Sequence, residues 1–108
     1  MPNPIIHMDV VCYKEDDLFV AHCLQLDLVT TATTVHQACI NMEDVIKAHI
    51  TYALNNNNLK NIFKPAPPEI WQLMSNADVI DGKPIQELSF PSLPPPHLIY
   101  QIQRLCVQ

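Results

Sequence analysis

The chain has very little glycine and no cluster of basic residues. Gly82 is the only glycine among 108 residues, although there are ten prolines. Tight turns that require a positive φ must therefore use asparagine or aspartate, which also tolerate that conformation. Lysine and arginine together number six, and the net charge is −5. Because no basic patch can neutralise phosphates, we expect no direct binding of nucleic acid.

Long apolar runs and paired cysteines are also missing. No apolar stretch approaches the length of a membrane-spanning helix, and the first residues lack the basic and apolar regions of a signal peptide. The four cysteines are irregularly spaced and form no C-x-x-C pair. These absences predict a cytoplasmic protein with reduced thiols and no membrane association.

Hydrophobic residues make up 48% of the chain, which suits a single folded domain of this length. Apolar and other residues alternate over 6–13, and this period of two predicts a half-buried strand. A charged turn follows, and the next strand, over 18–23, is expected to form a hairpin with the first. β-branched residues predict a third strand over 28–33.

The hydrophobic period changes to that of a helix after residue 34. Thr34 and Gln37 have the spacing of a capping box, which marks a helix start. Apolar residues then recur on one stripe, predicting a long amphipathic helix over 35–54. His49 falls within this stripe. It is either a core histidine bonded to the backbone or a residue at the contact with another subunit.

The last part of the chain is rich in proline. Pro68 can begin a short helix, and we expect this helix to pack on its own sheet. Trp71 of the same helix is the alternative, as an anchor for a partner. Residues 85–90 and 98–107 predict a C-terminal strand or hairpin.

The predicted fold is therefore α+β, with an antiparallel sheet of three to four strands packed against one long helix. Residues 1–64 are expected to form the core of the domain. Residues 65–108 are expected to form a proline-rich extension that packs on the same domain.

The first half of the chain resembles the HicB-like antitoxin family. The similar residues lie in the second strand, at the entry to the third strand and at the helix start: Phe19-Val20-Ala21-His22-Cys23, Leu26, Val29-Thr30 and Thr34-Val35-His36-Gln37-Ala38. The similarity covers about residues 5–55. It implies a partial ribonuclease-H-like fold without catalytic carboxylates, and association into dimers or larger oligomers. Typical members bind and block a small ribonuclease toxin, and many carry a C-terminal DNA-binding domain, of which residues 65–108 show no sign.

We therefore expect a protein-binding module rather than an enzyme, with no cofactor. The acidic net charge suits a small basic toxin as partner. Because one helix covers one sheet face, the opposite face is a candidate interface with a partner or a second copy. On the first strand this face is formed by His7, Asp9, Val11 and Tyr13. The alternatives are a stand-alone oligomeric HicB-like protein without a toxin, and a DNA-binding repressor, which would need a basic recognition element.

Metal chemistry has weaker sequence support. Zinc needs three or four converging ligands, and adjacent strand residues such as His22 and Cys23 point to opposite faces. We therefore expect no metal site, with Cys12 and Cys39 as small buried apolar residues. A metal-dependent nuclease, a further alternative, would need carboxylates from several strands, but only Asp9 lies inside one. No catalytic residue is expected.

Overall fold

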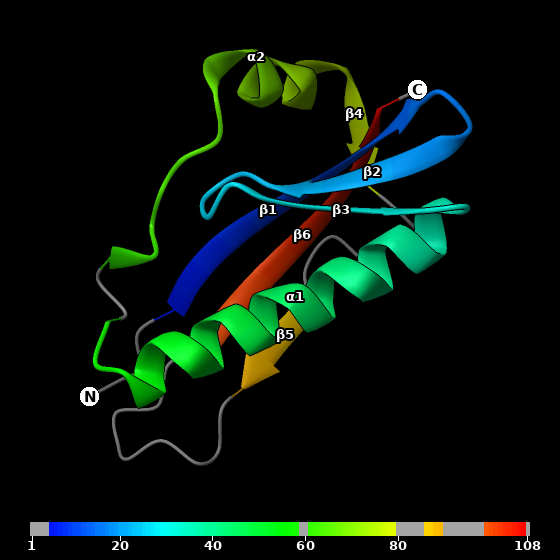
Figure 1. Cartoon of the computed structure of the whole chain (residues 1–108). Helices are drawn as coiled ribbons and strands as arrows, with labels where there is room; N and C mark the ends of the chain where they lie inside the picture. Colours follow the sequence, from blue (N-terminus) through cyan, green and yellow to red (C-terminus); the bar gives the residue numbers. More distant parts are fainter. Residues whose placement is uncertain (1–4, 59–60, 80–85, 90–98, 108) are drawn as a thin grey trace.

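The computed structural model describes residues 5–58, 61–79, 86–89 and 99–107. The described strands form one mixed sheet, and α1 lies across one face of it (Figure 1). The elements in chain order are β1 (Ile5–Glu15), β2 (Leu18–Cys23), β3 (Leu28–Ala32), α1 (Val35–Asn55), α2 (Pro68–Trp71), the 3-10 helix η2 (Gln72–Asn76), β4 (Ala77–Val79), β5 (Gln86–Ser89) and β6 (Ile99–Val107).

The predicted α+β class is confirmed, but the sheet is larger than expected and is not purely antiparallel. The strand order is β3-β2-β1-β6-β4, and β5 also pairs with β6. The first three strands are antiparallel, as predicted. In contrast, β6 runs parallel to β1, from the Ile5–Ile99 pair to the Cys12–Cys106 pair. Alternation of apolar and polar residues indicates which face of the sheet each side chain occupies. The direction of a strand and its neighbours in the sheet depend instead on long-range pairing.

The prediction that aspartate and asparagine would replace glycine at turns is confirmed. Three described residues other than glycine have a positive φ: Asp16, Asp27 and Asn57, at 55°, 52° and 50°. Asp16 lies in the β1–β2 turn, Asp27 in the β2–β3 loop, and Asn57 follows α1. Short side chains with an acceptor oxygen tolerate this left-handed conformation better than other residues with a Cβ do.

At the start of α1, the structure contains the Thr34 contact of the predicted capping box. The Thr34 hydroxyl accepts a hydrogen bond from the backbone N–H of Gln37 at 3.1 Å. The Gln37 side chain, however, donates to Asn41 Oδ1 at 2.7 Å. Thr34 is thus an N-cap, and Gln37 supports the first turn from within the helix.

Thr34→Ala should lower the free energy of unfolding by about 1 kcal/mol, because one backbone N–H of the first turn loses its acceptor. Thr33→Ala is the matched control, since Thr33 is exposed and precedes the cap. Urea titrations followed by circular dichroism measure both variants. Equal stability of the two variants would contradict the capping role.

The main core lies between α1 and the sheet face that α1 covers. Its fully buried members from α1 are Ala38, Cys39, Met42, Ile46, Ile50 and Ala53. From the sheet it includes Met8, Val10, Cys12, Ala21, Cys23 and Ile102. His49 is half-buried, and both interpretations of it, as a core histidine bonded to the backbone and as a residue at a subunit contact, stay predictions.

An ion pair joins α1 to β6 at the side of this core. Arg104 Nη1 lies 3.6 Å from Glu43 Oε1, and the two side chains are 13% and 16% exposed. Both charged groups are therefore largely removed from water. The pair fixes the long helix to a strand that enters the sheet from the C-terminal part of the chain.

The opposite face of the sheet is covered over part of its area. Ile70, Trp71 and Met74 from α2 and η2 pack against a second cluster that contains Val11 and Leu105. The backbone N–H of Ala66 also donates to the carbonyl of Leu24 at 2.8 Å, which attaches the connector to the sheet. The prediction that the short helix packs on its own sheet is confirmed.

Candidate functional site

The part of this second face that no described segment covers lies over β1, β2 and β3. Residues that pair directly across neighbouring strands share a face of the sheet. One row crosses Tyr13, Val20 and Thr31. The row beside it runs through Val11, His22 and Val29. Cys12 of β1 packs on α1, so these rows point away from that helix.

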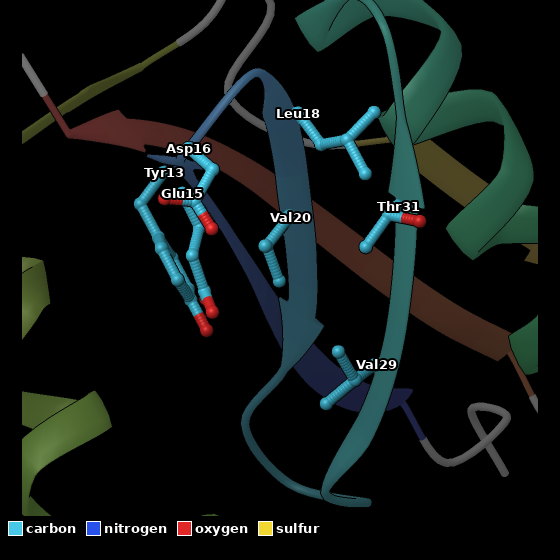
Figure 2. A pocket seen from close by; sticks show the side chains of 7 residues that line it. All are labelled: Tyr13, Glu15, Asp16, Leu18, Val20, Val29 and Thr31. Atoms are coloured by element: carbon cyan, nitrogen blue, oxygen red, sulfur yellow. The ribbon is translucent and has the colours of Figure 1, made fainter.

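A hollow of about 280 Å³ lies on this uncovered area. Figure 2 shows Tyr13 and Glu15 on one side of it, and Val29 and Thr31 of β3 on the other. It is lined by Tyr13, Glu15, Asp16, Leu18, Val20, Val29 and Thr31. Hydrophobic side chains and two carboxylates are therefore presented together on one surface.

Two hydrophobic side chains at the hollow are exposed, whereas Val20 at its floor is buried. Leu18 is 40% exposed and Val29 is 53% exposed. Glu15 and Asp16 line the same side of the hollow as Tyr13 (Figure 2), and both residues are exposed. Burial, with a smaller contribution from Glu15, raises the pKa of the Tyr13 phenol. The surface is apolar with an acidic rim.

The four residues proposed from the first strand lie in different environments. His7 is exposed, whereas Val11 is completely buried beneath the segment that contains Trp71. Asp9 is half-buried: its carboxylate accepts from Gln25 Nε2 at 2.8 Å, and Gln25 Oε1 accepts from the Asp9 N–H at 2.7 Å. Tyr13 is the one member that lines the hollow. An interface role for this set stays a prediction, and Val11 has no exposed surface to contribute.

Most residues of the hollow come from β2 and β3 and were not predicted. The register of the β1–β2 hairpin places Leu18 on the same face as Tyr13, and the register of the β2–β3 hairpin adds Val29 and Thr31. The alternation of each strand is visible in the sequence. A correct register for both hairpins would have grouped these residues.

His22 and Asp27 form a close polar pair beside this surface. His22 Nε2 lies 2.7 Å from Asp27 Oδ1, and His22 is only 5% exposed. Asp27 has a positive φ in the β2–β3 loop, so this contact ties the loop to β2. Nucleophilic catalysis would need a hydroxyl or thiol bonded to the second ring nitrogen. Nδ1 of His22 has no hydrogen-bond partner among the described residues.

The cysteines are present as thiols, and three of them are buried in the main core. Cys12 Sγ and Cys39 Sγ are 3.2 Å apart, joining β1 to α1. The contact with Cys39, together with burial, holds the pKa of Cys12 far above its usual value. Within the described ranges, no three or more His, Cys, Asp or Glu side chains are arranged to hold a metal ion.

Burial raises the pKa of Cys23 from 9.0 to about 11. The unfolded chain ionises this thiol first, so its contribution to stability is present below pH 9 and is lost as the pH rises towards 11. We expect a loss of about 2 kcal/mol in the free energy of unfolding across this window. Urea titrations at several pH values should show a shallower decline for Cys23→Ala. Equal slopes for the two proteins would contradict the shift.

Comparisons with protein-family models, curated proteins and solved structures found no match for this chain. In the part of the chain that the structure describes, no helix combines the length and the apolar character needed to cross a membrane. What the chain does must therefore be inferred from its own residues, geometry and charge.

Proposed function

We propose that the chain is a HicB-like protein-binding module whose partner is a small basic protein. A ribonuclease toxin that the module inhibits is the leading candidate for this partner. The observation that carries the proposal is the exposed apolar hollow with its acidic rim. Reduced thiols, three of them buried, suit action in the cytoplasm.

Two properties of the hollow support a protein partner. Leu18 and Val29 expose apolar surface at the two ends of the hollow, with Val20 and Thr31 between them (Figure 2), and burying such surface drives association. Glu15 and Asp16 add negative charge at the rim, which favours encounter with a basic surface and selects against an acidic one. A second copy of this chain has net charge −5 and is the poorer match at this face.

Affinity capture tests the proposal. A tagged chain expressed in the organism that encodes it should retain a small basic protein at low salt, identified by mass spectrometry. The purified partner should then bind the purified chain, and the chain should suppress the partner's ribonuclease activity. Recovery of the chain alone, or with copies of itself only, would overturn the proposal.

A charge-inserting variant tests whether this face carries the binding. Replacing Leu18 and Val29 together by lysine should weaken binding of the purified partner at least about tenfold, because apolar contact is lost and the acidic character is cancelled. Thr51→Lys with Tyr52→Lys is the matched control. It adds the same two charges at exposed positions of α1, beyond the opposite face of the sheet. Equal affinity of both double variants would place the interface elsewhere.

A further inference from the structure

We infer that the partner adds an extended segment to the edge of β3, and that a lysine or arginine of this segment enters the hollow. The inference rests on the proposed function, since it specifies how the basic partner binds. Three observations support it: the outer edge of β3 that no described strand pairs with, the apolar and acidic lining of the hollow, and the negative charge close to both.

The outer edge of β3 is available for pairing. Among the described strands, β3 is the last at its end of the sheet and pairs with β2 alone. Beyond its pairing with β2, no backbone hydrogen bond of Leu28–Ala32 is found within the described ranges. In an antiparallel edge strand, every second residue directs its N–H and C=O outward, where an extended peptide can bind them.

The residues of β3 do not protect this edge. Proteins usually block such edges with charged side chains, proline or a covering segment. β3 has the sequence Leu-Val-Thr-Thr-Ala, without charge or proline, and none of its five residues is buried. Val29, Thr30 and Thr31 are β-branched and favour the extended form that a partner strand would pair with.

The hollow lies where side chains of an added strand would reach. Alternate side chains of that strand stand on the same face as Val29 and Thr31, which form the near wall of the hollow. Val20 lies between this wall and the Tyr13 ring on the opposite side (Figure 2). Its volume of about 280 Å³ is below the roughly 300–1,000 Å³ of pockets for drug-sized ligands, which suits one long side chain.

The chemistry of the hollow selects a basic side chain with an apolar stem. Val20 and Leu18 supply apolar contact for the methylene groups of lysine or arginine. Glu15 and Asp16 line the side of the hollow opposite Val29 and Thr31, where the positive head would come to lie (Figure 2). An acidic side chain would meet like charge there, and a short apolar one would leave the carboxylates without a cation.

A second copy of the chain fits this arrangement poorly. Symmetric pairing of two β3 edges would place Leu-Val-Thr-Thr-Ala against itself and would bring no basic residue to either hollow. Glu15, Asp16 and Asp27 of each copy would add like charge near the contact. The occupant is therefore a basic extended segment of a different protein.

Peptide probes test the mode of binding. The full chain, labelled with ¹⁵N, is titrated with a short peptide that alternates valine with lysine, and amide shifts are followed by NMR. Shift changes should concentrate on β2 and β3. The same peptide with glutamate in place of lysine should bind at least about tenfold more weakly. N-methylation of the amides that face β3 should abolish binding, whereas N-methylation of the outward amides should leave it intact.

A double variant that neutralises both carboxylates tests the role of the acidic rim. Glu15→Gln with Asp16→Asn should reduce affinity for the lysine peptide about fivefold to tenfold and remove most of its advantage over the glutamate peptide. Asparagine also tolerates the φ of 55° at position 16, so the turn is kept. Asp44→Asn with Glu69→Gln is the matched control, since it removes one aspartate and one glutamate at exposed positions of α1 and α2.

The outcomes separate this inference from the proposed function. Equal binding of the two N-methylated peptides, or no preference for lysine, would overturn strand addition even if a basic partner is captured. If the peptide results hold and no basic protein is captured, the β3 site stands and the proposed partner class is wrong. Shift changes centred on α1 would also overturn the inference.

Discussion

Ile102→Ala should lower the free energy of unfolding by about 2–5 kcal/mol. Ile102 of β6 is completely buried, pairs with Met8 of β1 and belongs to the core beneath α1. Truncation removes buried methyl groups and leaves a cavity that rigid neighbours fill only in part. Since small domains are stable by roughly 5–15 kcal/mol, this one change can remove a large share of the total.

Urea unfolding followed by the fluorescence of Trp71, the only tryptophan, measures this effect. Gln103→Ala is the neighbouring control on the opposite face of β6, where the side chain is partly exposed. A loss below about 1 kcal/mol for Ile102→Ala would mean that the core of residues 1–64 is stable without β6. The full loss would show that β6 is an integral part of the same folding unit.

Arg104→Met should lower the free energy of unfolding by about 3 kcal/mol. Arg104 and Glu43 are both largely buried, so methionine removes a cation that lies 3.6 Å from a carboxylate in a poorly hydrated site. Methionine keeps much of the side-chain volume, so the loss reports charge more than packing. Removing one partner of a buried ion pair costs about 3–5 kcal/mol. We expect the lower end of this range because both side chains keep some exposure.

A double-mutant cycle isolates this pair. Glu43→Leu with Arg104→Met removes both charges, and its stability should exceed that of the Arg104→Met variant by about 1–3 kcal/mol. Lys47→Met is the control for loss of a cation from an exposed position on the same helix. Additive losses in the cycle would show that the two charged groups contribute independently.

Much of the fold could be predicted because the local patterns are strong. The apolar stripe after Thr34 predicted a helix over 35–54, and α1 spans Val35–Asn55. The alternation over 98–107 predicted a strand that the structure places at Ile99–Val107. Its parallel pairing with β1 could not be predicted, because alternation is the same in parallel and antiparallel strands. The short β4 has no periodic signal at three residues.

The candidate site was harder to predict than the fold. Tyr13 was identified because it lies on the mixed face of the first strand, but Val11 on the same face is buried by α2 and η2. Which part of a sheet face stays open depends on where a later segment packs. Leu18 and Val29 belong to the open part, and only the three-dimensional register brings them together with Glu15.

The parallel pairing of β1 with β6 has a consequence for biosynthesis. β1 leaves the ribosome long before β6, the strand that satisfies one of its edges and ends at Val107. Until that strand emerges, the nascent chain exposes a largely apolar strand with one unpaired edge, a condition in which chains aggregate. Closing so long a loop also slows folding compared with proteins whose contacts are local. Folding of this domain is therefore expected to wait until β6 has been translated and to benefit from chaperones that shield nascent strands.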